Sequence, residues 1–271
     1  MCSMKIAISG KGGVGKTTIA STIARLMGRS GKKVVMVDCD PSPNLALSLG
    51  ISQEERKKIV PLCQLYDLVA ERTGVRPGES QGKLYKINPE VDDLLGKYGV
   101  KGKDNVILIV LGTIQTGGGG CFCPESALLK RLLSHLVRKE DVLIMDMEAG
   151  VEHLGRGTTR NIDILLIVVE PGQRSIETAS RIKKLAKDLG LPRIVAVLNK
   201  SRGRSHEEEI GGRLKDLDIK MIGSIPYSEI AMESDLKGIS LLDTEGNQPI
   251  IEAVENILEK LIPGEPALGE L

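Results

Sequence analysis

The 271-residue sequence has few aromatic residues: four tyrosines, one phenylalanine and no tryptophan. Proteins that bind single-stranded nucleic acid stack the bases on aromatic side chains, so we do not expect a single-strand-binding protein. Lys and Arg, 37 in total, nearly balance the 36 Asp and Glu residues, which leaves a net charge of +1. Such a balance creates no overall field that attracts nucleic acid or an anionic membrane. We therefore predict no nucleic-acid partner and no membrane partner.

Long apolar runs and a targeting segment are also lacking. No run approaches the roughly 18 apolar residues that a membrane-spanning helix needs. The N-terminus has no basic start, apolar stretch or small-residue cleavage site of a signal peptide. The five cysteines are an odd number, and without a secretory signal they are expected to stay reduced. These features predict a cytoplasmic protein.

Short runs rich in β-branched residues alternate with longer helical patterns along most of the chain. Runs such as 164–169 are apolar throughout, which suits strands buried on both faces of a parallel sheet. The predicted strands are Lys5–Ser9, Lys33–Asp38, Val106–Leu111, Val142–Asp146, Ile164–Val169, Ile194–Asn199 and Met221–Ile225. The predicted helices between them are Thr17–Arg29, Pro124–Arg138, Ser175–Leu189 and His206–Leu217. This order predicts an α/β fold with one doubly wound, mostly parallel sheet flanked by helices.

The pattern is least regular between residues 52 and 104, which contain three prolines and only short apolar runs. We interpret this segment as an insertion with one or two helices, over Val60–Ala70 and Val91–Tyr98, rather than as a second domain. A single domain is therefore predicted for residues 1–262. The remaining residues, 263–271, contain two prolines and are predicted to form a disordered tail.

The most informative motif is GKGGVGKTT at residues 10–18, which follows an apolar strand and opens a helix. It satisfies G-x-x-x-x-G-K-[ST], the pattern of a phosphate-binding loop. In such a loop backbone N–H groups wrap the phosphates, while Lys16 would reach the β- and γ-phosphates and the Thr17 hydroxyl would ligate Mg²⁺. The predicted nucleotide-binding residues of the loop are Gly12, Gly13, Val14, Gly15, Lys16, Thr17 and Thr18.

The same residues also fit G-x-G-x-x-G, the pattern of dinucleotide-binding proteins, at Gly10, Gly12 and Gly15. Asp38 even lies at a suitable distance downstream for a contact with the ribose. The Lys16-Thr17 pair favours a nucleoside triphosphate, because a triphosphate needs a cation and a hydroxyl that binds its metal. A purely structural glycine turn is the remaining alternative.

Acidic residues follow two of the predicted strands. Strand 33–38 continues into Asp38-Cys39-Asp40, and strand alternation puts the two Asp side chains on one side and Cys39 on the other. Asp38 would ligate Mg²⁺ through water, and Asp40 would orient the attacking water as a catalytic residue. Asp40 could instead only cap the next turn. Asp146 ends strand 142–146, where a Walker B aspartate is expected. The predicted magnesium residues are Thr17, Asp38 and Asp146.

A second glycine cluster precedes a cysteine pair, in the segment GGGGCFCP at residues 117–124. Two thiolates at C-x-C spacing can bind a soft metal ion, but they cannot fill a tetrahedral site alone. A twofold dimer would bring four thiolates together, so Cys121 and Cys123 are candidate ligands for Ni²⁺ or Zn²⁺ at a dimer interface. The helix that follows is expected to lower the pKa of both thiols. A redox-active disulfide and two ordinary loop cysteines are the alternatives.

Lys11 gives the loop the form K-G-G-x-G-K-[ST], a deviant Walker A motif that resembles the MinD/ParA/nitrogenase-iron-protein class of ATPases. The resemblance implies that Lys11 crosses a dimer interface and touches the partner's phosphates, as a catalytic charge supplied in trans. The D-x-D-P motif of the class supports the roles given to Asp38 and Asp40. A solvated loop lysine is the alternative for Lys11.

The same resemblance implies further positions around the nucleotide. Asn199 would read the edge of the adenine, Pro226 would shape the base pocket, and Met147–Gly150 would form a second switch that senses the γ-phosphate. His153 follows this switch, and we interpret it as a hydrogen-bonded switch residue rather than as a metal ligand. Mg²⁺ and ATP or ADP are therefore the expected cofactors.

The stretch DMEAGVEHLGRGT at 146–158, together with the C-x-C pair, VEP at 169–171 and NK at 199–200, narrows the resemblance. It is similar to the CooC-type nickel-insertion ATPases, accessory proteins of carbon monoxide dehydrogenase, and related members serve acetyl-CoA synthase. The resemblance implies an ATP-hydrolysing metallochaperone that dimerises with ATP, binds Ni or Zn, and matures the nickel site of one of these clients. It does not distinguish between the two clients.

Three other functions fit the same class of loop. A MinD-type positioning ATPase needs a basic amphipathic C-terminal helix, whereas helix 250–261 is followed by an acidic tail broken by proline. A ParA-type DNA-segregation ATPase needs a basic patch, which the net charge of +1 does not suggest. An ATP-dependent reductase with an iron–sulfur cluster takes two widely separated cysteines per subunit, whereas Cys121 and Cys123 are only two positions apart.

Overall fold

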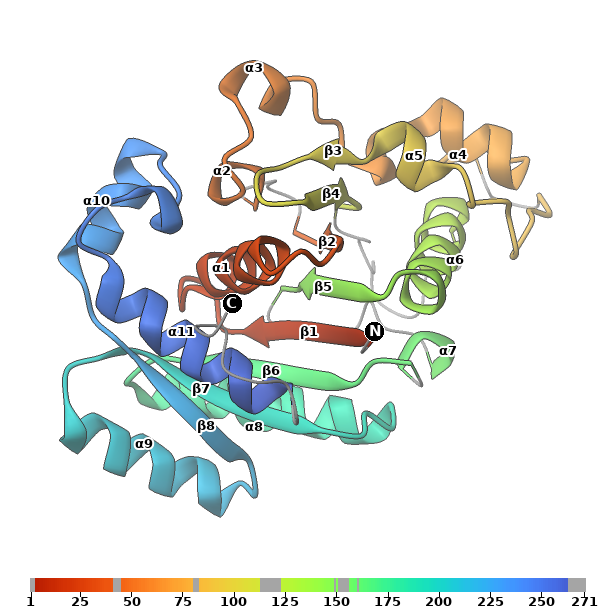
Figure 1. Cartoon of the computed structure of the whole chain (residues 1–271). Helices are drawn as coiled ribbons and strands as arrows, with labels where there is room; N and C mark the ends of the chain where they lie inside the picture. The colour runs from red at the N-terminus through yellow and green to blue at the C-terminus, as the bar shows by residue number, and fades with distance from the viewer. Residues whose placement is uncertain are drawn as a thin grey trace.

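The computed structural model describes residues 3–40, 45–79, 83–112, 123–148, 150, 156–159 and 161–262. Within them eight strands form one sheet in the order β3-β4-β2-β5-β1-β6-β7-β8 (Figure 1). The strands are β1 (Met4–Gly10), β2 (Val34–Asp38), β3 (Val100–Lys101), β4 (Val106–Val110), β5 (Val142–Asp146), β6 (Ile164–Val169), β7 (Ile194–Ser201) and β8 (Lys220–Pro226). Only the pairing of β3 with β4 is antiparallel. The predicted fold class is confirmed.

Helices cover both faces of the sheet (Figure 1). One face is covered by α1 (Lys16–Arg29), α2 (Leu45–Ser48) and α11 (Gln248–Leu261). The other face is covered by α4 (Tyr66–Thr73), α5 (Leu94–Tyr98), α6 (Pro124–Lys139), α8 (Gln173–Asp188) and α9 (Arg204–Asp216). Along β2 the side chains of Val34 and Met36 enter the first core, whereas those of Val35, Val37 and the following Cys39 enter the second. This alternation is what the sequence pattern predicts for a strand buried on both faces.

The structure describes five further helices, which are α3 (Gln53–Arg56), η1 (Leu62–Gln64), α7 (Arg156–Thr159), α10 (Glu229–Lys237) and η2 (Leu241–Asp243). Of these, η1 adds Leu62 to the second core and η2 adds Leu241 to the first. The predicted helix Val60–Ala70 is instead two pieces, η1 and α4, because Leu65 between them has a non-helical backbone (φ −82°, ψ 70°). No helix in the described part of the chain is long and apolar enough to cross a membrane.

The segment 52–104 ends in a hairpin that the sequence did not predict. The edge strand β3 is only two residues long and partly exposed, so it carries no periodic signal. Asp104 and Asn105 both adopt positive φ (54° and 56°) in the turn to β4, as a type I′ hairpin turn requires of its two central residues. The assignment of residues 1–262 to a single domain stays a prediction. Residues 263–271, the predicted tail, lie outside the described part.

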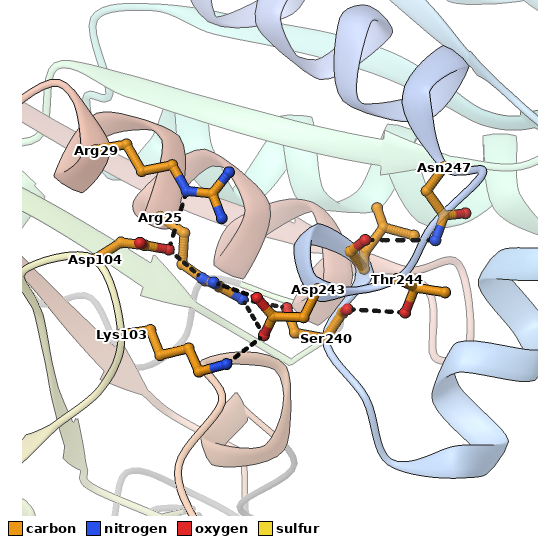
Figure 2. Close-up of polar contacts among 9 residues, drawn as sticks. Arg25, Arg29, Lys103, Asp104, Ser240, Asp243, Thr244 and Asn247 are labelled. Atoms are coloured by element: carbon orange, nitrogen blue, oxygen red, sulfur yellow. Dashed lines mark hydrogen bonds and ion pairs between the residues drawn. The ribbon is translucent and has the colours of Figure 1, made fainter.

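A buried arginine ties this hairpin and the C-terminal region to α1 (Figure 2). Arg25 on α1 is 1% exposed; its Nε donates to Asp104 Oδ2 at 2.6 Å. Its two terminal nitrogens donate to the two carboxylate oxygens of Asp243, at 3.0 and 2.9 Å, and Nη1 also donates to Ser240 Oγ at 2.7 Å. We call Arg25, Asp104, Ser240 and Asp243 the Arg25 cluster. It holds three distant segments of the chain together.

Candidate functional site

The loop between β1 and α1 (residues 11–15) lies at the carboxyl ends of the parallel strands, where open α/β sheets bind ligands. Gly15, the residue before α1, has φ 94°, a left-handed conformation that favours glycine. A Cβ at Gly15 would also lie 2.3 Å from Asn199 Nδ2, and one at Gly10 would lie 2.3 Å from the Val168 carbonyl oxygen. Glycine at these two positions lets the loop approach β6 and β7 closely.

The loop lines a pocket of ≈ 730 Å³. The predicted site residues that line it are Gly12, Gly13, Gly15, Lys16, Thr17, Thr18, Asp40, Asn199 and Pro226. The rest of the lining includes Tyr227, Met232 of α10, Leu241 of η2, and Ile250 and Val254 of α11. Val14 is not among the lining residues because its side chain is fully buried in the core beneath the loop. Lys16 Nζ lies 3.4 Å from the Lys11 carbonyl oxygen.

Thr17, Asp38 and Asp146 meet at the ends of β2 and β5. Asp38 and Asp146 are register partners on these adjacent strands, and Thr17 Oγ1 donates to Asp146 Oδ2 at 2.6 Å. One oxygen of each carboxylate, Asp38 Oδ2 and Asp146 Oδ1, is buried without a hydrogen-bond partner. Buried carboxylate oxygens without donors are rare, and Mg²⁺ prefers oxygen ligands. The residues present therefore fit a divalent cation.

Burial also changes the acidity of these two carboxyl groups. It raises the pKa of Asp38 to about 7, although the Asp40 backbone N–H, which donates to Asp38 Oδ1 at 3.0 Å, opposes the change. Burial likewise raises the pKa of Asp146 to about 6, against the Thr17 hydroxyl and the charge of Lys16. A cation between the carboxylates would favour their ionised forms.

Two consecutive residues of β7 hold the loop. Asn199 Nδ2 donates to the Val14 carbonyl oxygen at 2.7 Å, and Lys200 Nζ donates to the Gly13 carbonyl oxygen at 2.7 Å. The pairing of β7 with β8 shifts register between Leu198 and Ser201, and such irregularities redirect side chains. Asn199 was expected beside the base; it lines the pocket, but its amide N–H is bonded to the loop. The contact of Lys200 with the loop was not predicted.

Lys11 and Lys200 both pair with Glu170, which directly follows β6. Lys11 Nζ lies 3.2 Å from Glu170 Oε1, and Lys200 Nζ lies 3.1 Å from Glu170 Oε2. Although burial opposes it, these two ammonium groups lower the pKa of Glu170, so the carboxylate is ionised. We call these three residues the Glu170 cluster. In the sequence, Glu170 stood out only as part of the VEP tripeptide at 169–171, which contributes to the family resemblance.

Ser9, at the end of β1, contacts the segment that follows β5. Its hydroxyl oxygen lies 2.8 Å from the Glu148 carbonyl oxygen and 2.9 Å from that of Gly150, and it accepts the Gly150 N–H at 3.2 Å. Ser9 therefore connects the phosphate-loop strand to the predicted second switch, a link the sequence did not reveal. Ala149 of that switch, and His153, lie outside the described residues.

The predicted metal pair is described only in part, since Cys121 and the preceding glycines lie outside the described residues. Cys123 immediately precedes α6; its side chain is buried, and its thiol donates to Ser126 Oγ at 3.0 Å. The expectation of a lowered thiol pKa is wrong for Cys123, because burial raises it. Among the residues that the structure describes, no group of three or more His, Cys, Asp or Glu is arranged to hold a metal ion.

Known proteins resemble this chain along most of its length. Residues 5–241 match a family described as the CobQ/CobB/MinD/ParA nucleotide binding domain. An uncharacterized ATP-binding protein of Methanocaldococcus jannaschii is 48% identical, over 95% of this chain and 98% of that protein. The carbon monoxide dehydrogenase accessory protein CooC of Rhodospirillum rubrum is 42% identical, over 89% and 90%.

Solved structures share the fold. The septum site-determining protein MinD from Pyrococcus horikoshii, complexed with Mg-ADP, has a TM-score of 0.68 at 19% identity, over the full length of both chains. A ParA family ATPase from Chlorobium tepidum has a TM-score of 0.67 at 20% identity, over 97% of this chain and 99% of that one. At these identities the likeness shows a common fold.

Proposed function

The chain belongs to the CobQ/CobB/MinD/ParA family of nucleotide-binding proteins and is an ATPase, and we propose that its hydrolysis cycle matures the nickel site of a client enzyme. The observation that carries this proposal is the 42% identity, over 89% of the chain, to a carbon monoxide dehydrogenase accessory protein. The proposed client is carbon monoxide dehydrogenase or acetyl-CoA synthase. The chain would deliver the metal as its cargo.

The proposed ATP site uses the loop and the start of α1. The triphosphate would accept hydrogen bonds from the backbone N–H groups of residues 12–18, and Lys16 would neutralise charge on the β- and γ-phosphates. The 3.4 Å contact of Lys16 with the Lys11 carbonyl oxygen supports this assignment, because so long a contact is readily exchanged for a phosphate oxygen.

Thr17, Asp38 and Asp146 would hold the magnesium ion, and their two partnerless carboxylate oxygens support this. When bound, Mg²⁺ supplies positive charge that stabilises the phosphates as bond breaking proceeds. Asp40 lines the same pocket and would hold the attacking water by accepting its proton in a hydrogen bond.

Base selection would fall to Asn199 and the walls of the pocket. The Asn199 amide N–H is bonded to the Val14 carbonyl oxygen, which leaves the amide oxygen to accept a hydrogen bond. Adenine offers a 6-amino donor, whereas guanine offers a 6-oxo acceptor, so this orientation favours ATP. Pro226 and the apolar residues Ile250 and Val254 would pack around the base.

The proposed active form is a homodimer. Lys11 would reach across it to the partner's phosphates, and Cys121 and Cys123 of both protomers would bind one Ni²⁺ or Zn²⁺ through four thiolates. The Cys123 thiol is buried and bonded to Ser126, so it must leave this contact and become exposed before it can bind a metal shared with a second protomer. That requirement offers a physical means by which nucleotide state could change metal affinity.

A metal titration tests this proposal. The protein is titrated against a chromophoric chelator without nucleotide, with ADP, and as the Asp40→Ala variant with ATP. We expect one metal per dimer, an affinity that differs between nucleotide states, and loss of binding in the Cys121→Ala/Cys123→Ala double variant. One metal per monomer, or binding that survives the double substitution, would contradict the shared site.

A second assay separates nucleotide binding from hydrolysis. Lys16→Ala should abolish ATP binding, whereas Asp40→Ala should retain binding and lose hydrolysis, because only the attacking water loses its acceptor. Phosphate release and nucleotide affinity are measured on the same preparations. Parental hydrolysis by Asp40→Ala would remove Asp40 from the proposed mechanism.

A further inference from the structure

Glu170 has no part in the ATPase steps described above, although its partner Lys11 does. The Glu170 carboxylate uses both oxygens, Oε1 for Lys11 and Oε2 for Lys200, and its side chain is 22% exposed. The lysine that should serve a second protomer is therefore paired within its own chain. A lysine kept merely for solubility would extend into water rather than meet a half-buried carboxylate.

Lys200 fixes this carboxylate in place. Its backbone adopts a left-handed conformation (φ 57°), which is uncommon for a residue with a Cβ and persists only where surrounding contacts determine it. Its ammonium group bonds both the Gly13 carbonyl oxygen and Glu170. Glu170 is consequently anchored to the phosphate loop through Lys200, while its other oxygen is left for Lys11.

We propose that Glu170 is a positioning residue that retains Lys11 on its own protomer and releases it only to the ATP phosphates of a second copy. This inference rests on the proposed ATP-driven dimer. The contact is suited to release, because Lys11 is 38% exposed and half-exposed ion pairs contribute little to stability. A triphosphate concentrates more negative charge than one carboxylate and competes for the same ammonium.

Retention of this kind raises the protein concentration at which ATP drives dimerisation. Each protomer must break one Lys11–Glu170 pair, so the two contributions multiply in the dimer dissociation constant. An ion pair of this exposure is expected to raise the dimer dissociation constant roughly threefold. Removing the pair from both protomers should therefore lower that constant on the order of tenfold. Nucleotide binding by the monomer should be unchanged, since Lys200 keeps its bond to Gly13.

The first measurement is the dimer dissociation constant, by analytical ultracentrifugation with Mg²⁺ and a non-hydrolysable ATP analogue. Glu170→Gln is compared with the parent protein and with Glu177→Gln, an exposed glutamate on α8 that contacts Gln173. We expect Glu170→Gln to dimerise at roughly tenfold lower concentration and Glu177→Gln to behave as the parent.

The second measurement detects the contact itself in nucleotide-free protein. Lys11 is labelled with a pulse of an amine-acylating reagent and quantified by peptide mass spectrometry. Labelling should be roughly threefold faster in Glu170→Gln than in the parent or in Glu177→Gln, because Lys11 no longer has its carboxylate partner.

The two measurements separate the possible failures. Unchanged Lys11 labelling in Glu170→Gln, with dimerisation equal to that of the parent, overturns the retention of Lys11 and leaves the proposed function intact. Faster labelling without dimerisation of either protein by the ATP analogue overturns the proposed ATP-driven dimer, and the inference with it.

Discussion

The Arg25 cluster and the Glu170 cluster both consist of ion pairs, but the numbers of positive and negative groups are reversed. In the first, one arginine that is 1% exposed serves two carboxylates, with a bidentate contact to Asp243 (Figure 2). In the second, one carboxylate serves two lysines that are 38% and 41% exposed. A guanidinium offers a rigid fork of donors, whereas an ammonium on a flexible stem changes partners easily. The Arg25 cluster is therefore suited to hold chain segments together permanently, and the Glu170 cluster is suited to a contact that can break.

Their positions agree with this difference. The Arg25 cluster joins α1 to the β3–β4 turn and to η2, elements that line or support the pocket. At Gly28 on α1 a Cβ would lie only 1.6 Å from the Asp104 carbonyl oxygen, so the turn packs directly on the helix. The Glu170 cluster instead lies beside the phosphate loop, where proposed partners and phosphates arrive. The degree of burial thus distinguishes the structural contacts of Arg25 from the reversible contact that we propose for Lys11.

The largest expected effect follows from removing the buried cation. Arg25→Met should lower the free energy of unfolding by about 3 kcal/mol, because Asp104 and Asp243 lose their shared partner. Urea denaturation measures the change. The matched control is Arg29→Met, since Arg29 is 45% exposed and meets the same Asp104 at 3.3 Å; it should cost below about 1 kcal/mol. Equal losses in the two variants would contradict the distinction between the clusters.

Acid should weaken the Arg25 cluster over a defined range. Arg25 lowers the pKa of Asp243 from 3.8 to about 2, so the folded state keeps this carboxylate ionised where the unfolded chain protonates it. Its contribution to stability is present above pH 3.8 and is lost as the pH falls towards about 2. Urea midpoints measured across this range should fall less steeply in Asp243→Asn. An identical slope in both proteins would exclude Asp243 as a source of the acid sensitivity.

Glu170→Gln should change the free energy of unfolding by less than about 1 kcal/mol, because its partners are half-exposed. The change should diminish further towards 1 M salt, where screening acts over about 3 Å. The loss in Arg25→Met should persist at the same salt concentration, since water and ions do not reach its guanidinium. Urea denaturation at low and high salt makes the comparison. A salt-independent loss above about 2 kcal/mol in Glu170→Gln would make this cluster structural.

The smallest effect is expected at the edge of the Arg25 cluster. Lys103 Nζ lies 3.0 Å from Asp243 Oδ2, but the lysine is 53% exposed (Figure 2). Lys103→Met should therefore cost no more than about 0.5 kcal/mol in urea denaturation. A loss near that of Arg25→Met would show that exposure does not govern the strength of these contacts.

Local pattern was sufficient to locate the longer strands and the loop and acidic residues at the ends of β1, β2 and β5. Each of the seven predicted strands lies within two residues of its observed ends, since apolar runs mark strands buried on both faces. Elements without such a pattern were missed, among them the two-residue β3 and α10, which buries only Ser234. The break at Leu65 and the burial of Cys123 were also missed, because both depend on contacts with other segments.

The sequence alone therefore determined the sheet, the phosphate loop and the acidic strand ends, because these features repeat over a few neighbouring residues. The sequence did not determine which charged side chains form ion pairs. Arg25 meets Asp104 and Asp243 across 79 and 218 positions of the chain, and Lys11 meets Glu170 across 159. Such pairings depend on strand order and on the packing of loops against helices, which no local period encodes. Only the tertiary structure decided that the Arg25 guanidinium is buried between two carboxylates, and that the more exposed Lys11 pairs with Glu170 of its own chain.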